Sequence, residues 1–118
     1  MKEYTAVPHY LVELYTPNAA WRALPAESRQ QFLNGIQAAM GDLSSLGVEV
    51  LALSETDGGI DRASEHRFLG IWRLPDAHVR DALLAGIKAS GWYTYFDHVN
   101  AASDAGGFAT HLASLKLA

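Results

Sequence analysis

Two places in the sequence combine residue types that could move a proton. Glu13 lies between apolar residues in the stretch HYLVELYT (9–16), which is rich in β-formers. Asp97 and His98 stand side by side in GWYTYFDHVN (91–100), together with four aromatic rings. A carboxylate buried among apolar neighbours can act as a general base with a raised pKa. An aspartate beside a histidine suggests a catalytic pair. The fold must decide which of these side chains meet.

Alternation along a strand limits the possible pairs. Adjacent strand residues point to opposite faces, so Asp97 and His98 cannot interact directly within one strand. We predict that Tyr95 and Asp97 share a face with Glu13, on the condition that Phe96 faces the helices. A register slip of one residue would instead bring Phe96 and His98 to Glu13.

Glu13 and His98 could also have a purely structural role, with no part in catalysis or ligand binding. Glu13 could form an ion pair with Arg67 or Arg73 of a neighbouring strand, which would satisfy its charge without any chemistry. His98 could be a hydrogen-bonded structural residue. The functional interpretation assigns two catalytic and four ligand-binding residues. These are Glu13 and Asp97 for catalysis, and Tyr15, Arg73, Tyr95 and His98 for ligand binding.

Motifs for several other chemistries are missing from the sequence. The absence of cysteine excludes disulfides, thiolate metal sites and thiol nucleophiles. The five histidines show no HxH or HxxxH spacing, so we predict no metal site. There is no GxGxxG, no P-loop and no Gly-x-Ser-x-Gly elbow. We therefore expect no cofactor, neither haem nor flavin.

Composition indicates one globular domain spanning residues 1–118. Hydrophobic residues make up 49% of the chain and charged residues 19%, which is typical of soluble proteins. The net charge is −4 and the nine Lys and Arg residues are scattered, so we expect no nucleic-acid partner. Without a long apolar run or a signal-peptide core, we expect a cytoplasmic protein that does not enter membranes.

Residue patterning predicts the order strand, helix, strand, strand, helix, strand, followed by a short C-terminal helix. The predicted strands span about 9–16, 48–55, 67–74 and 93–100, the helices about 25–46, 77–90 and 107–115, and residues 18–24 form a linker or turn. This is the split βαβ order of the ferredoxin-like fold, an α+β sandwich with a four-stranded antiparallel sheet. Right-handed crossovers would place the first and third strands in the centre, parallel to each other, with both longer helices on one face.

Nearly every predicted strand is apolar on both faces, although the helices cover only one. An apolar sheet face without a cover usually marks an interface, so we predict a homodimer through the sheet face. The βαββαβ order, the two-sided strands and the ending WYTYFDHVN resemble the dimeric α/β-barrel superfamily over about residues 8–102. The resemblance implies that fold, a dimer, and a cavity between sheet and helices or within the barrel.

The superfamily includes small monooxygenases, isomerases and stress-responsive proteins. We therefore expect a dimer that binds a small polar or aromatic molecule in the barrel cavity, as a cofactor-independent monooxygenase or isomerase. The alternative is a non-catalytic dimeric module for ligand sensing or stress response.

Overall fold

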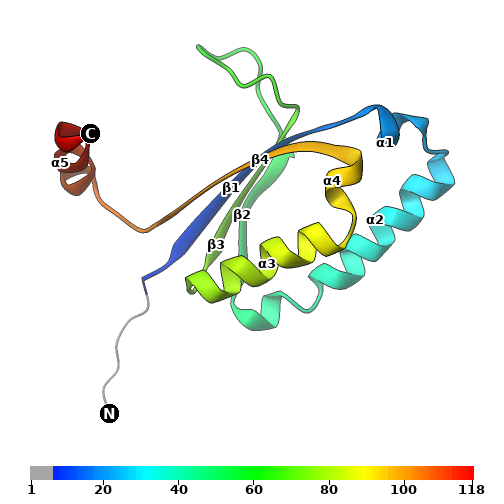
Figure 1. Cartoon of the computed structure of the whole chain (residues 1–118), viewed down its shortest axis with the longest axis horizontal. Coiled ribbons are helices and arrows are strands. Elements are labelled where there is room, and N and C mark those ends of the chain that lie inside the picture. The colour runs from blue at the N-terminus through cyan, green and yellow to red at the C-terminus, as the bar shows by residue number, and fades with distance from the viewer. Residues whose placement is uncertain (1–6) are drawn as a thin grey trace.

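The computed structural model describes residues 7–118 of the 118-residue chain. The chain forms an α+β structure (Figure 1). Its elements are β1 (His9–Pro17), α1 (Ala19–Ala23), α2 (Ala26–Met40), the 3-10 turn η1 (Ser44–Leu46), β2 (Glu49–Glu55), β3 (Phe68–Leu74), α3 (Ala77–Ala89), α4 (Trp92–Tyr95), β4 (Phe96–Asp104) and α5 (Phe108–Leu117). Within residues 7–118, no helix has both the length and the apolar character needed to cross a bilayer.

The four strands form one sheet in the order β2-β3-β1-β4. The prediction that β1 and β3 are central is confirmed, as are the antiparallel pairs β1–β4 and β2–β3. The central pair is also antiparallel, with Glu13 opposite Gly70, so the predicted parallel pairing of these strands was wrong. The crossover helix connects β1 to β2, which run in the same direction and are separated by the position of one further strand. Strand β3 follows β2 directly, occupies that position and runs antiparallel to both neighbours.

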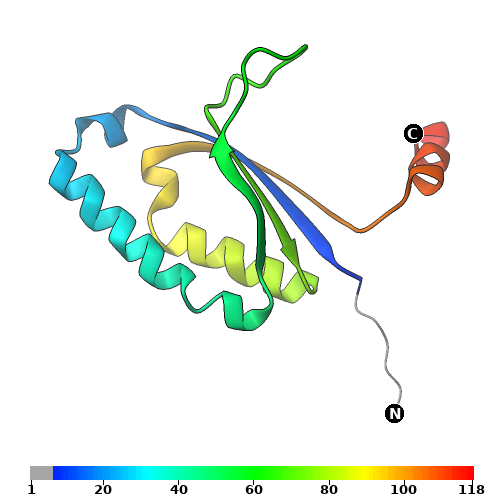
Figure 2. The ribbon, with the colours of Figure 1, turned by 180° about the vertical axis from the view of Figure 1, so that it is seen from behind.

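Helices α2 and α3 cover the same face of the sheet, and no helix formed by residues 7–118 lies on the other face (Figures 1 and 2). The centre of the core lies under these helices. Its buried members are Leu11, Trp72, Leu74 and Leu83. Side chains of β1 at odd positions therefore point toward the helices, and those at even positions point to the open face.

The segment before β2 differs from the single helix predicted over 25–46. Residues 18–24 contain the short helix α1, which begins where the Asn18 side chain accepts a hydrogen bond from the backbone N–H of Trp21 at 3.1 Å. The main helix α2 ends at Met40, and a 3-10 turn follows. Gly47 then adopts a left-handed conformation with φ of 89°, which redirects the chain into β2.

The stretch that the sequence presented as one strand is divided between a helical turn and a strand. Gly91 has φ of 87°, which ends α3 and starts the single turn α4. Strand β4 begins only at Phe96 and continues to Asp104. The predicted strand over 93–100 was therefore wrong in its first three residues, so Tyr93 and Tyr95 have no strand face. The helical turn instead lets the rings of Trp92 and Phe96 stack at 3.9 Å between centroids.

Candidate functional site

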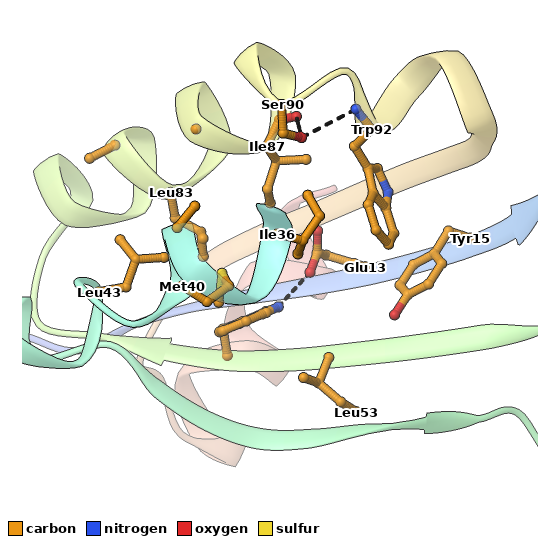
Figure 3. A pocket seen from close by; sticks show the side chains of 14 residues that line it. Glu13, Tyr15, Ile36, Met40, Leu43, Leu53, Leu83, Ile87, Ser90 and Trp92 are labelled. Carbon is orange, nitrogen blue, oxygen red and sulfur yellow. Dashed lines mark hydrogen bonds between the residues drawn. The ribbon is translucent and has the colours of Figure 1, made fainter. Parts of the chain in front are cut away.

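A pocket of about 230 Å³ lies between the covered face of the sheet and helices α2 and α3 (Figure 3). Its walls are mainly aliphatic, with Ile36 and Met40 from α2 and Leu83 and Ile87 from α3. The polar groups that line it come from the sheet and from the α3–α4 turn. They are Glu13, Tyr15, Trp72, Ser90 and Trp92. An apolar pocket with a few convergent polar groups is the usual form of a small-molecule site.

Glu13 places its carboxyl group at the sheet side of this pocket, where it is only 4% exposed. Its Oε1 accepts a hydrogen bond from the indole Nε1–H of Trp72 at 2.5 Å. Its Oε2 lies 3.2 Å from Nε2 of His98, whose side chain is 2% exposed. The alternative ion pairs are not formed, because Arg67 pairs with Glu55 instead and Arg73 points to the open face.

Gly70 provides the space that this carboxyl group occupies. It lies directly opposite Glu13 on β3. A Cβ atom at this position would stand 3.1 Å from Oε1 of Glu13, 3.3 Å from Nε1 of Trp72 and 3.0 Å from Cδ2 of Leu53. A side chain here would push the carboxyl group and the indole apart, so the missing side chain is part of the site.

His98 lies between the carboxyl group and a second tryptophan. The indole Nε1–H of Trp92 donates to its Nδ1 at 3.0 Å. An indole N–H can only donate, so Nδ1 must be the unprotonated nitrogen and the ring proton lies on Nε2. Nε2 has Oδ1 of Asn100 as its hydrogen-bond partner at 2.7 Å, and Oε2 of Glu13 lies 3.2 Å from the same nitrogen, an ion pair when the ring is charged. The side chains therefore form a connected chain of polar contacts from Trp72 through Glu13 and His98 to Trp92.

The pKa of His98 reflects opposing influences. Burial lowers this pKa, but the hydrogen bonds to Glu13 and Asn100 and the negative charge of Glu13 outweigh it, so the pKa lies above its ordinary value. The contact with Trp92 acts against protonation, because a proton on Nδ1 would face the indole N–H. The histidine therefore sits between one neighbour that favours its charged form and one that requires its neutral form.

Tyr15 completes the polar part of the pocket from β1. Its ring stacks on the imidazole of His98 at 5.6 Å and meets the ring of Trp92 edge-on at 5.2 Å. Burial and the charge of Glu13 raise the pKa of its hydroxyl above the ordinary value. The hydroxyl therefore stays protonated at neutral pH and is available as a hydrogen-bond donor.

The structure brings together three of the six residues proposed from the sequence. Glu13 and Tyr15 line the pocket, and His98 contacts the carboxyl group from behind. Of the two alternatives for the β4 register, the structure has the one in which Phe96 and His98 share the face of Glu13. The other alternative, in which Tyr95 and Asp97 share that face, is wrong.

The remaining three residues lie elsewhere. Asp97 is exposed on the open face, because it alternates with His98. Arg73 is exposed on the same open face, opposite Glu49 of β2. Tyr95 belongs to α4, where its ring packs against other aromatic rings outside the pocket, those of Trp21 and Phe32.

Sequence reasoning missed Trp72, Trp92 and Gly70 as parts of the site. Trp92 belongs to the helical turn α4, which the sequence pattern did not predict. The usable signal was Gly70, since a glycine inside the apolar strand FLGIWRL marks a close approach of another group. Among residues 7–118, no cluster of three or more His, Asp or Glu side chains is arranged to hold a metal ion.

Comparison with known proteins gives a family but no activity. Residues 8–117 match the model of a family of unknown function (DUF6616), and because the match covers nearly the whole chain, the chain belongs to this family. No curated protein matches the sequence.

Proposed function

We propose that this chain is a ferredoxin-like protein that binds a small, largely apolar molecule in the pocket and moves a proton on it, as a cofactor-independent isomerase. The strand order β2-β3-β1-β4, with two helices on one face, supports the fold. The observation that carries the function is the Glu13–His98 pair, buried in the protein and bordering an apolar pocket.

The size and lining of the pocket define the class of ligand. A volume of about 230 Å³ equals the space of about eight water molecules, which suits a molecule with a single ring. Aliphatic and aromatic walls favour an apolar body, and the hydroxyl of Tyr15 can donate a hydrogen bond to one ligand oxygen. A small cyclic ketone has both features.

The proposed reaction needs only groups that this chain supplies. Glu13 removes a proton from a carbon next to the ketone carbonyl, and the electron pair moves onto the ligand oxygen, which Tyr15 stabilises. Where the ketone has a β,γ double bond, Glu13 then returns the proton to the γ carbon, the carbonyl group is restored and the double bond moves to the α,β position. His98 stays beside the other carboxyl oxygen, with its Nε2 at 3.2 Å, and so holds the base in position. A monooxygenase would share the first step and would need dioxygen as the oxidant.

A non-catalytic ligand sensor is the second candidate, and one observation favours it. Each carboxyl oxygen of Glu13 already has a partner, Trp72 or His98. An oxygen with one hydrogen bond retains a second acceptor position, so this arrangement does not prevent catalysis. The same contacts of Glu13 with Trp72 and His98 would also serve a protein in which these residues only support the floor of a binding pocket.

The test uses cyclohex-3-enone, whose conversion to cyclohex-2-enone is a proton removal and return that near-ultraviolet absorbance follows. We expect the wild-type chain to accelerate this conversion. Glu13→Gln should abolish turnover, because the amide keeps an acceptor for Trp72 but cannot take a proton. The variant should still bind the ketone, as measured by saturation-transfer NMR.

Each outcome has a distinct meaning. Binding by the wild-type chain without conversion would favour the sensor, and equal turnover by Glu13→Gln would exclude this residue as the base. If Glu13→Gln lost its cooperative thermal transition, the carboxyl group would be structural and the proposal would fail. Asp97→Asn is the matched control, because it makes the same chemical change on the open face and should leave turnover unaltered.

A further inference from the structure

Trp92 forms part of the pocket wall and is held there by a partner that can change its charge. Figure 3 shows its indole ring extending from the α3–α4 turn toward Glu13 and Tyr15. The indole Nε1–H donates to Nδ1 of His98 at 3.0 Å. With Tyr15 and Trp72, Trp92 supplies the aromatic part of a wall that is otherwise mainly aliphatic. The position of this ring therefore affects both the size of the pocket and the character of its wall.

A second proton on His98 would break the contact with Trp92. In the neutral ring, Nδ1 accepts from the indole N–H, and Nε2 carries the proton beside Oδ1 of Asn100 at 2.7 Å. Protonation would place an N–H on Nδ1, directly opposite the indole N–H. Two donors cannot share a hydrogen bond, so the two rings must separate. Turning the imidazole over gives no relief, because the charged ring carries an N–H on both nitrogens.

The other neighbours of His98 allow its ring to become charged in place. From β1, the carboxyl group of Glu13 lies 3.2 Å from Nε2, and the ring of Tyr15 stacks on the imidazole. From α4, the ring of Tyr93 meets the imidazole edge-on at 5.2 Å. The ordinary pKa of tyrosine is about 10, so near neutral pH the carboxylate is the charged group among these three, and it favours the imidazolium. Trp92 is therefore the neighbour that has to give way.

Trp92 can move while the elements around it stay in place. It is the first residue of the single turn α4, and the two residues that follow, Tyr93 and Thr94, are exposed. Its backbone N–H donates to Oγ of Ser90, which anchors the turn while the side chain moves. The indole stacks on the ring of Phe96. A slide across that ring takes the indole N–H away from His98 without ending the stack.

We propose that Trp92 is a movable wall of the pocket, which neutral His98 holds in place and protonated His98 releases. The proposal concerns regulation of the proposed site and rests on the proposed function in one respect, that the pocket takes a small ring-bearing molecule. A ring that packs against the indole then binds more tightly while His98 is neutral. Because coupling between two binding equilibria is reciprocal, the ligand must favour release of the His98 proton by the same factor.

The movement is measured first without a ligand, from ¹H–¹⁵N spectra of the indole N–H groups between about pH 5 and 8.5. The Trp92 signal should move upfield as the pH falls, because its hydrogen bond is lost, with the same midpoint as the ring signals of His98. Trp21 is the internal control, since its ring packs on Phe32 and Tyr95 and not on His98. In His98→Gln, which cannot become charged at this position, the Trp92 signal should not depend on pH. A wild-type Trp92 signal that stays constant while His98 titrates would overturn the proposal.

The coupling is then measured with phenol as the ligand, by NMR titrations at about pH 5.5 and 8.5. The dissociation constant should be at least about 5-fold higher at the lower pH, because the indole has left the wall. The pKa of His98 should be lower in the phenol complex than in the free chain by the logarithm of the same factor. Trp92→Phe keeps an aromatic ring but has no N–H to lose, so its affinity for phenol should be the same at both pH values.

Every other outcome counts against the movable wall. Equal phenol affinity of the wild-type chain at both pH values would overturn it, and so would tighter binding at the lower pH or no binding at either. A pH dependence that persists in His98→Gln would assign the coupling to Glu13 instead. If His98→Gln does not fold, the wild-type spectra decide, because the midpoints of Trp92 and His98 must coincide. None of these measurements involves turnover, so a chain that moves Trp92 and converts no ketone would support this proposal while the proposed isomerase failed.

Discussion

The indole N–H of Trp92 lies 3.0 Å from Nδ1 of His98, and this contact fixes which ring nitrogen faces Glu13. The indole is held by the α3–α4 turn, where the Trp92 backbone N–H donates to Oγ of Ser90 at 3.2 Å. The turn exists because Gly91 can adopt a left-handed conformation. A glycine at the end of a helix therefore positions the indole that contacts this histidine on β4.

Trp92→Phe should raise the pKa of His98 further and release its tautomer. The substitution removes the donor that requires an unprotonated Nδ1, while Glu13 and Asn100 continue to favour the charged form. Two-bond ¹H–¹⁵N correlation spectra of the imidazole across a pH titration measure both quantities. Trp21→Phe is the control, because Trp21 packs on Phe32 and Tyr95 and not on His98. An unchanged titration curve in Trp92→Phe would show that the indole does not influence the proton.

The stability of the protein should depend on pH through His98. Its pKa is raised in the folded state, so the folded chain binds the proton more tightly than the unfolded chain. This contribution to the free energy of unfolding is fully present below the unfolded value of about 6.5 and is lost as the pH rises through the folded value. Urea unfolding between pH 5 and 8, compared with His98→Gln, isolates the effect. A wild-type minus variant difference that is flat or increases with pH would contradict the sign.

Gly70→Ala should destabilise the protein by about 1–3 kcal/mol, the usual cost of overpacking a core. The new methyl group would stand 3.1 Å from Oε1 of Glu13 and 3.0 Å from Leu53, and sheet backbone on both sides limits relaxation. Gly35→Ala is the matched control on α2. A Cβ there meets nothing within 4 Å, and replacing a helical glycine should stabilise by about 0.5–1 kcal/mol. Chemical denaturation of both variants measures the difference, which should have opposite signs.

The sequence predicted an α+β sheet with the first and third strands in the centre, because strand alternation and helix spacing are local patterns, but it did not predict that this central pair is antiparallel. It also predicted that Glu13 would be the buried carboxylate, since a central strand with apolar neighbours leaves it little access to water. What it could not supply was the start of β4. Residues 92–95 have the aromatic composition of a strand, yet the turn at Gly91 continues them as a helical turn.

The later start of β4 changes which residues lie beside Glu13 in the site. With a strand from residue 93, Tyr95 and Asp97 were expected beside Glu13; with β4 starting at Phe96 and Glu13 opposite Asn100, His98 takes that place. Register depends on the contacts of the whole sheet, which no local pattern encodes. The glycine at position 70 was visible in the sequence, but its meaning required knowing which residue lies opposite.

The pocket itself can be tested without knowledge of the natural ligand by filling it from α3. Gly86 lines the pocket, and a Cβ atom built there meets nothing within 4 Å, so a side chain would extend into free space. Gly86→Phe should therefore occupy the cavity and weaken binding of phenol, a probe with one ring and one polar group, by at least about 10-fold. The expectation follows from direct steric exclusion, with the aliphatic walls unchanged.

Two controls separate exclusion from a general effect of the substitution. Gly86→Ala should keep phenol binding and stabilise α3 by about 0.5–1 kcal/mol, because alanine is the better helix former. Gly35→Phe places the same ring on α2 at a residue that does not line the pocket, and should leave binding unchanged. Saturation-transfer NMR with phenol measures all four proteins. Equal binding by Gly86→Phe and the wild-type chain would show that phenol binds elsewhere, and the space beneath α3 would then be a packing void above the Glu13–His98 pair.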